Sequence, residues 1–487
     1  MIKEGETSPI FAIMGEGTEG TAMNMESCKL PYCVDRGEEL INWKQIYPHK
    51  PVNDHTVKAV GMAIAMQGSG IPYIDMGSAT IKLNDDGFYN LMVGATDIGQ
   101  GSDTILAQIA AEVLECKMDD MVVYSSDSDL TPFDTGAYAS STTYVSGNAV
   151  FRAASIMRKM LIKEAAHVFK VPMDDVVFDG KHFTSDEHSI SINELSNRLY
   201  YNEDQKQLVA TGSYVGTKSP PPFMAGFAEI EIDTETCEFH VEHYVSVVDC
   251  GTTINPMLAR GQVEGGIVQG TGMAVYEEVI YSKSGQLVTN DFMNYRIPSR
   301  HEIRKLTTEF ADSYEESGPF GAKSVGEIGI DTPPAAIANA IFNALGVRIT
   351  TLPITPEKIN FKKVKEAFNV YLFSSLDELI KQKPDAVSIC VPTHLHYQVA
   401  KKCLENGIHC LVEKPLSTDL NEIDELIDLA AKKNLVLTVG QIERFNPAVK
   451  QLKQQLDKLS TDESSDKHAI KFTADSGFNS EVNLEFM

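Results

Sequence analysis

Short apolar runs separated by glycine predict β-strands in the first part of the chain. The runs at 59–66, 78–83 and 88–93 have the length and composition of strands, and Asp85-Asp86-Gly87 forms a turn signal between the last two. We therefore expect a β-hairpin there. Apolar positions with a helical period follow at 105–114, and further helices are expected near 35–47 and over about 148–169.

Strand and helix patterns alternate in the last part of the chain. Apolar runs at 386–391, 409–412 and 435–439 are separated by helical patterns near 397–406 and 420–433, which is typical of βαβ units with parallel strands. Residues 450–487 are polar and mixed, and we expect a disordered tail. The predicted fold class is a multidomain α/β and α+β protein, divided into a lead-in (1–55), a main part (56–359), a partial Rossmann-like segment (360–449) and the tail (450–487).

Charge and composition narrow the classes of partner. The chain has 487 residues, 43% of them hydrophobic, and its 42 basic against 68 acidic residues give a formal net charge of -26. Nucleic acids and anionic membranes bind basic surfaces, so we expect neither as a partner. The sequence has no apolar run of about 20 residues and no signal-peptide core at its start, and a cytoplasmic location is expected. None of its eight cysteines has a zinc or iron–sulfur spacing.

Three segments rich in glycine or small polar residues are candidate binding loops. Residues 94–104 place glycines before an expected helix with Ser102 or Asp103 as its N-cap, an arrangement that directs backbone N–H groups at an anion such as phosphate. Residues 133–147 carry many Ser and Thr hydroxyls ahead of a helix, and residues 261–272 place Gln262 and Gln269 among five glycines. Each segment taken alone is equally compatible with an ordinary surface turn or helix cap.

A single glutamate, Glu327, lies between glycines in the segment 318–336, before Pro333-Pro334 and an apolar helix. Neighbouring glycines allow a carboxylate to approach a bulky ligand closely. A positioned general base has this form, whereas the alternative is an acidic residue in a surface turn.

Residues 1–359 resemble the C-terminal part of the molybdenum-binding subunit of xanthine dehydrogenase, in the molybdenum hydroxylase family. The resemblance rests on the sequences V-G-A-T-D-I-G-Q-G-S-D-T, D-T-G-A-Y-A-S-S-T-T-Y-V-S-G-N-A-V, D-C-G-T-T-I-N-P-M-L-A-R-G-Q-V-E-G-G-I-V-Q-G, N-Y-R-I-P and K-S-V-G-E. It implies a molybdopterin-binding domain over 56–359 and hydroxylation of a purine such as xanthine or hypoxanthine, with oxygen from water.

The resemblance also implies roles for individual residues. Glu327 would be the catalytic base, in a buried position, and no side chain would ligate the metal directly. The implied cofactor is a molybdenum–pyranopterin, expected in its dinucleotide form, with iron–sulfur clusters and FAD on partner subunits that accept the electrons. The residues implied to bind the cofactor are Gly99, Gln100, Gly101, Ser102, Gly136, Ala137, Ser140, Ser141, Thr142, Gln262 and Gln269.

Residues 361–449 resemble the middle of the nucleotide-binding domain of the Gfo/Idh/MocA oxidoreductase family. The matching sequences are D-A-V-S-I-C-V-P-T-H-L-H-Y, G-I-H-C-L-V-E-K-P-L and V-G-Q-I-E-R-F-N-P-A. The family's lysine motif falls on Glu413, Lys414 and Pro415, and NAD(P) is the cofactor it implies. The first strand and its G-x-G-x-x-G loop are absent, so we expect this segment not to bind NAD(P) unaided. Two alternatives to the molybdenum enzyme stay open: an NAD(P)-dependent sugar dehydrogenase, and a non-functional fusion of two truncated modules.

Overall fold

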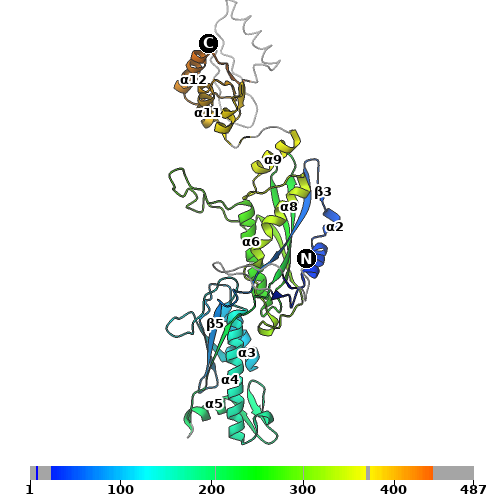
Figure 1. The fold of residues 1–487 in the computed structure, drawn as a ribbon, viewed down its shortest axis with the longest axis vertical. Coiled ribbons are helices and arrows are strands. Elements are labelled where there is room, and N and C mark those ends of the chain that lie inside the picture. Colours follow the sequence, from blue (N-terminus) through cyan, green and yellow to red (C-terminus); the bar gives the residue numbers. More distant parts are fainter. Residues whose placement is uncertain are drawn as a thin grey trace, which may run out of the picture. The chain divides into compact units, whose positions relative to one another are not determined.

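The computed structural model describes residues 7–8, 23–202, 205–299, 301–368, 373 and 375–441, and the predicted tail at 450–487 lies outside them. The chain divides into two compact units, residues 1–370 and 371–487, which are described separately. Both units combine helices and sheets, which confirms the predicted fold class (Figure 1).

The first unit is built on two main sheets. The five-stranded sheet has the order β14-β13-β12-β4-β3, and the four-stranded sheet has the order β11-β5-β6-β7. The strands of the first are β3 (His49–Pro51), β4 (Thr56–Met66), β12 (Phe223–Asp233), β13 (Phe239–Asp249) and β14 (Ile303–Phe310). Those of the second are β5 (Met76–Leu83), β6 (Tyr89–Val93), β7 (Met121–Ser125) and β11 (Val209–Val215). The predicted hairpin is confirmed, because β5 and β6 pair antiparallel around the turn at 84–88.

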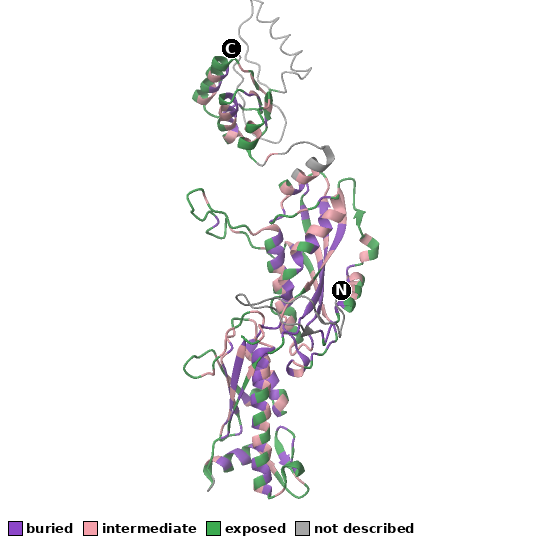
Figure 2. Cartoon of the chain, viewed as in Figure 1, coloured by how far each residue is buried: buried purple, intermediate pink, exposed green. Residues whose placement is uncertain are grey.

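Helices cover both faces of the five-stranded sheet. Strand β12 alternates its apolar side chains between the two faces: Ala225 and Phe227 lie in the cluster with α1 (Leu30–Leu40), and Met224 and Ala228 lie in the cluster with α8 (Pro333–Leu345). Helix α1 begins earlier than the helix expected near 35–47, and it buries Cys33 and Gly37 against the sheet. The strands are accordingly among the most buried parts of the unit (Figure 2).

The four-stranded sheet is covered on one face. Ala79, Ile81 and Leu83 of β5 share a buried cluster with α3 (Ser102–Leu114) and the long helix α4 (Val145–Phe169), which runs beside the sheet in Figure 1. On the other face, hydroxyl pairs such as Thr80 and Thr211 bond across β5 and β11. Strand β5 pairs antiparallel with both neighbours in a sheet that is covered on one face, which explains the alternation of apolar and polar residues along it.

Smaller elements complete the first unit. The short strands β1 (Thr7–Ser8) and β2 (Met23–Asn24) pair with each other, and β8 (Val177–Phe178), β9 (His182–Thr184) and β10 (Ser189–Ser191) form a small sheet. The remaining helices are α2 (Trp43–Ile46), α5 (Ile192–Tyr201), α6 (Pro256–Val275), α7 (Ile328–Asp331) and α9 (Pro356–Phe368). Ile359 of α9 is fully buried in the core of the five-stranded sheet, so α9 packs with the first unit.

The second unit is a small parallel sheet with helices. Strands β15 (Ala386–Ile389), β16 (His409–Val412) and β17 (Leu437–Val439) pair in that order, with α10 (Leu376–Lys381), α11 (Thr393–Glu405) and α12 (Leu420–Lys433) between and before them. The predicted βαβ pattern is confirmed. Within the described residues β15 pairs only with β16 and is mostly exposed, as expected for an edge strand.

Candidate functional site: a cavity at the start of three helices

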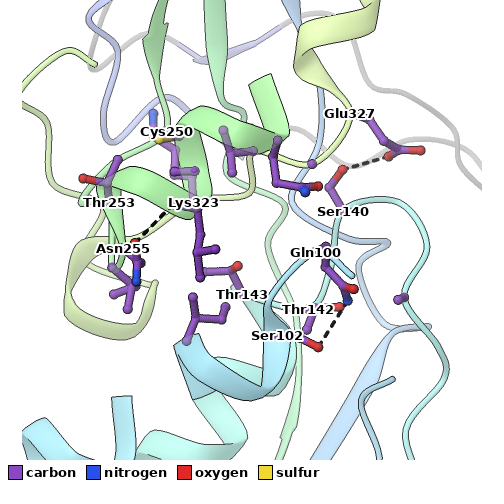
Figure 3. Close-up of a pocket in the computed structure, with 18 of the residues that line it drawn as sticks. Gln100, Ser102, Ser140, Thr142, Thr143, Cys250, Thr253, Asn255, Lys323 and Glu327 are labelled. Carbon is purple, nitrogen blue, oxygen red and sulfur yellow. Dashed lines mark hydrogen bonds between the residues drawn. The ribbon is translucent and has the colours of Figure 1, made fainter. Parts of the chain in front are cut away.

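A cavity of about 270 Å³ lies in the first unit, where four distant parts of the chain meet. Figure 3 shows side chains from the start of α3, the segment before α4, the start of α6 and the segment before α7 converging on it. The residues that line it are Ile98, Gln100, Ser102, Ile105, Ala137, Ser140, Thr142, Thr143, Cys250, Thr252, Thr253, Ile254, Asn255, Leu258, Ala259, Gln262, Lys323, Val325, Gly326 and Glu327.

Three helices begin at this cavity. Ser102 is the first residue of α3, Thr142 and Thr143 precede α4, and Asn255 caps α6 by accepting a hydrogen bond from the backbone N–H of Leu258 at 3.1 Å. The partial positive charge of a helix N-terminus attracts anions. Together with the hydroxyl and amide side chains of the wall, these helix starts suit a ligand that carries phosphate and many ring heteroatoms. This donor set fits a pyranopterin cofactor.

The glycine segment at 94–104 differs from the expected open phosphate loop. The Asp97 carboxylate accepts hydrogen bonds from the backbone N–H groups of Gly99 (2.8 Å), Gly101 (3.4 Å) and Asp103 (3.1 Å). Desolvation acts to raise the pKa of Asp97, but these backbone bonds outweigh it and lower the pKa. The N–H groups of Gly99 and Gly101 therefore donate to the Asp97 carboxylate of the same segment. The expectation that they point at the ligand is wrong.

The N-cap of α3 also differs from the residue predicted from the sequence. Gly101, with φ of 86°, is the N-cap of α3, and Ser102 is already helical. Because a Cβ at Gly101 would lie 2.8 Å from Leu258 Cδ1, glycine here lets α3 and α6 approach each other at the cavity. Gln100 lines the cavity and is held in place: its Oε1 accepts from the N–H of Ile98 at 2.6 Å, and its Nε2 donates to the carbonyl of Thr96 at 2.8 Å.

The hydroxyl-rich segment before α4 brings Ser140 to the rim of the cavity. Ala139 and Ser140 both have positive φ, 49° and 53°, a conformation that is unfavourable for residues with a Cβ. The strained turn is held by a hydrogen bond from the Gly70 N–H to the Ala139 carbonyl (3.0 Å). In this turn the Ser140 hydroxyl donates to Glu327 Oε2 at 2.9 Å (Figure 3). Of the other predicted residues here, Ala137 and Thr142 line the cavity, while Gly136 and Ser141 do not.

The third predicted loop is not a loop. Residues 261–272 lie inside α6, and two of their glycines allow close helix packing. A Cβ at Gly266 would lie 3.0 Å from Gly329 Cα, and one at Gly270 would lie 2.6 Å from the Ile330 carbonyl oxygen. Gln262 lines the cavity, but Gln269 is two helical turns further along, roughly 10 Å away, and does not. Its predicted place at the cavity is wrong because helical geometry separates the two side chains.

Within the described part of the chain, Glu327 is the only carboxylate that lines the cavity, and it is the N-cap residue of the short helix α7, without a side-chain capping bond. It is exposed, so the expectation of a buried base is not met in this chain; the reason is that its segment forms the rim and not the floor of the cavity. Below the rim, Lys323 forms an ion pair of 2.9 Å with Asp249, and both side chains are fully buried. This ion pair fixes the segment from which Glu327 projects.

Sequence reasoning missed part of the wall. Thr252, Thr253 and Asn255 follow β13 and line the cavity, although no role was predicted for them. The signal was present in I-N-P, because asparagine followed by proline is a typical start of a helix. A long-range ion pair such as Lys323 with Asp249 leaves no comparable local signal.

The second unit has its own candidate residues. Glu413, Lys414 and Pro415 follow β16 on an exposed segment, and Glu413 Oε2 accepts from the Lys414 N–H at 3.2 Å. His396 of α11 lies against this segment, with Nδ1 2.7 Å from the Pro415 carbonyl oxygen. The parts of the chain that the structure describes contain no group of three or more His, Cys, Asp or Glu side chains able to hold a metal ion. They also contain no helix with the length and apolarity to cross a bilayer.

Comparison with known proteins agrees with this geometry. Residues 36–304 match the molybdopterin cofactor-binding domain, and residues 344–441 match the oxidoreductase family with an NAD-binding Rossmann fold. The chain is 37% identical over 366 residues to a probable hypoxanthine oxidase of Escherichia coli strain K12, which covers 74% of this chain and 37% of that protein. It is 32% identical to the gamma subunit of the 6-hydroxypseudooxynicotine dehydrogenase complex of Paenarthrobacter nicotinovorans, over 62% of this chain and 39% of that one.

A solved structure shows the same architecture. Quinoline 2-oxidoreductase from Pseudomonas putida 86 superposes with a TM-score of 0.65 at 27% identity, over 71% of this chain and 46% of that one. The chain thus spans less than half the length of these three proteins. Since the family match covers more than half of its residues and includes the walls formed by α3, α4 and α6, the chain belongs to the molybdopterin cofactor-binding domain family.

Proposed function

We propose that this chain forms the cofactor-holding part of a molybdenum-dependent oxidoreductase of the xanthine dehydrogenase type, which hydroxylates a purine such as xanthine or hypoxanthine. The observation that carries the proposal is the convergence of three helix starts and one carboxylate, Glu327, on a single cavity. A molybdenum–pyranopterin group would supply the redox chemistry that amino-acid side chains lack.

The residues of the wall have separate tasks in this proposal. Ser102, Ser140, Thr142, Gln100 and Gln262 line the cavity with hydroxyl and amide groups, which would hold the pterin ring and its phosphate, in a dinucleotide form. The starts of α3, α4 and α6 would stabilise the phosphate charge. Glu327 would accept a proton during the reaction, and its place at the rim leaves it accessible to a substrate.

The purine and the partners are supported by the relatives. A relative at 37% identity is a probable hypoxanthine oxidase, which favours a purine. Another is a subunit of a dehydrogenase complex, which supports our proposal that iron–sulfur and flavin subunits take up the electrons. For residues 375–441 the match to an NAD-binding family keeps an NAD(P)-dependent dehydrogenase as the alternative function, which equilibrium binding of NAD to the full chain would detect.

The test replaces Glu327 in the full chain, assembled with its iron–sulfur and flavin subunits. Glu327→Gln keeps the shape of the side chain and removes the proton acceptor, so purine turnover should fall by about 100-fold or more. Molybdenum and pterin content, measured on the same sample, should stay level. The matched control is Glu112→Gln on the exposed side of α3, which should leave turnover unchanged. Near-normal turnover of Glu327→Gln at full molybdenum content would refute the base, and absence of molybdenum from the unmodified assembly would refute the proposal as a whole.

A further inference from the structure

A glutamine outside the predicted site contacts the proposed base. Gln67 follows the end of β4, and its side-chain Nε2 lies 2.5 Å from Glu327 Oε2 and 3.4 Å from Ser140 Oγ. The two contacting residues are separated by 260 positions in the sequence, so the contact exists only in the folded chain.

The chemistry of the pair fixes the orientation of the amide. A carboxylate can only accept hydrogen bonds, so the Gln67 side chain must turn its NH₂ group, and not its carbonyl oxygen, toward Glu327. Ser140 donates to the same oxygen, Oε2, at 2.9 Å. Two donors thus hold one oxygen of the carboxylate, and no donor from the described residues holds the other, Oε1, which is available to take a proton.

The Gln67 amide makes this contact with Glu327 at a cost in stability. In the described part of the chain Gln67 Oε1 is buried and has no hydrogen-bond partner. A buried acceptor without a partner lowers stability, so a purely structural role would be filled better by an apolar side chain of similar length. The bond to Glu327 is the favourable contact that the side chain does make.

The backbone around both residues is tied together by buried serines. The Ser324 N–H donates to Ser69 Oγ at 3.0 Å, and the Ser324 hydroxyl donates to the Gly68 carbonyl at 2.8 Å. The Ser69 hydroxyl in turn donates to the Pro220 carbonyl at 2.6 Å. The segment that carries Gln67 and the segment that carries Glu327 are therefore held in register, independently of either side chain.

From these contacts we infer that Gln67 is a positioning residue, which acts with Ser140 to fix the Glu327 carboxylate at the rim of the cavity with one oxygen available as the proton acceptor. This inference rests on the proposed function. It assigns Gln67 no contact with cofactor or substrate, since Gln67 is not among the residues that line the cavity.

The first test needs no cofactor and measures the contact itself. Urea unfolding of the full chain is compared for Gln67→Met, Glu327→Ala and the double variant. If Gln67 bonds to Glu327, the shift in midpoint caused by Gln67→Met should be altered once Glu327 is alanine, because contacting residues are not additive. Strictly additive shifts would overturn the inference. Gln207→Met, an exposed glutamine that bonds to Tyr200 instead, is the control and should remain additive with Glu327→Ala.

The second test separates positioning from folding in the loaded assembly. Gln67→Met should lower kcat by roughly 10- to 100-fold, the scale of misplacing a catalytic group, with KM and molybdenum content changed less than about 2-fold. Gln207→Met should leave kcat unchanged. Normal kcat in Gln67→Met, alongside a large loss in Glu327→Gln, would overturn the positioning role while leaving the proposed function intact. Full turnover in Glu327→Gln at full molybdenum content would instead refute Glu327 as the base, and the inference with it, while absence of molybdenum from the unmodified assembly would refute the proposed function as a whole.

Discussion

At the scale of single residues, the fully buried ion pair between Lys323 and Asp249 anchors the segment that contains the proposed base, Glu327. Desolvation acts to raise the pKa of Asp249, yet the charge of Lys323 and hydrogen bonds from Ser313 and the Lys29 N–H outweigh it and lower the pKa. Asp249 is therefore ionised at neutral pH. Lys323 also donates to the carbonyls of Ser27 (3.3 Å) and Pro221 (3.1 Å), so its ammonium group is well satisfied although it is buried. Five parts of the first unit, at residues 27–29, 221, 249, 313 and 323, are joined at this point.

A second residue gives the protein a pH dependence that can be measured. His243 lies on β13 with Nε2 2.9 Å from Thr307 Oγ1, and burial, followed by the charge of Lys305, lowers its pKa from 6.5 to about 4. In the unfolded chain the imidazole binds a proton near pH 6.5, whereas in the folded chain it stays neutral down to about pH 4. Its contribution to stability is therefore intact above pH 6.5 and is lost as the pH falls from 6.5 to about 4.

We predict that His243→Gln, which can still bond to Thr307, flattens this part of the stability profile. The free energy of unfolding of the unmodified chain should fall by up to about 3 kcal/mol more than that of the variant between pH 7 and pH 4. Urea unfolding at a series of pH values measures the difference. The same replacement at the exposed His301 is the control, and equal pH slopes for the unmodified chain and His243→Gln would contradict the prediction.

At the scale of elements, the packing of α6 against α7 determines the position of Glu327. Gly266 and Gly270 allow the helix to approach Gly329 and Ile330, which belong to α7 and immediately follow Glu327. Helix α8 begins directly after α7 with Pro333, and its buried face rests on the five-stranded sheet. The rim of the cavity is thus set by helix packing that leaves no room for side chains at the two glycines.

Adding one methyl group at this contact should be costly. In Gly270→Ala the new Cβ would lie 2.6 Å from the Ile330 carbonyl oxygen and 2.9 Å from Pro333 Cγ, so backbone must move, at a cost of about 1–3 kcal/mol. Turnover should fall too, because α7 and Glu327 shift together.

Gly261→Ala in the same helix is the matched control. No atom lies within 4 Å of its added Cβ, and alanine favours a helix by about 1 kcal/mol over glycine. Urea unfolding should therefore show a gain for Gly261→Ala and a loss for Gly270→Ala. Equal effects of the two substitutions on stability would show that close packing of α6 against α7 does not contribute to it.

At the scale of the whole molecule, the two units have separate hydrophobic cores. The core of the second unit contains Ile389, Cys403, Leu404 and Val412, and among the residues whose burial the structure describes the clusters of the first unit end at Ile359. Helix α9 belongs to the first unit: Asn360 donates to the Thr236 carbonyl at 3.2 Å. Each unit should therefore unfold by itself.

We predict two transitions in calorimetry of the full chain. A shortened chain of residues 1–370 should keep the transition of the first unit within about 2 °C, because the core that produces it is complete. A chain of residues 1–355 lacks α9 and with it the buried Ile359, and its transition should move down by several degrees. A single transition in the full chain, or loss of the first-unit transition in residues 1–370, would contradict independent units.

Local patterns in the sequence were sufficient for much of the secondary structure and for most of the cavity. The strands β5 and β6, the turn between them, the long helix α4 and the parallel strands of the second unit follow from the period of apolar residues and from turn signals, which act over a few positions. The resemblance of several motifs to one family identified Gln100, Ser140, Gln262 and Glu327, and all four line the cavity.

Only the tertiary structure decided the features that depend on residues far apart in the chain. The glycines at 261–272 predict a loop from local preference, but they lie in helix α6, where Gly266 and Gly270 allow close packing against α7. Gln269 lies two helical turns beyond Gln262 and therefore does not reach the cavity, and the Asp97 carboxylate accepts hydrogen bonds from N–H groups that the sequence analysis assigned to a phosphate. The contact of Gln67 with Glu327 and the pairing of Asp249 with Lys323 leave no local signal, because hydrogen bonds and ion pairs are selected by proximity in the folded chain and not by spacing along it.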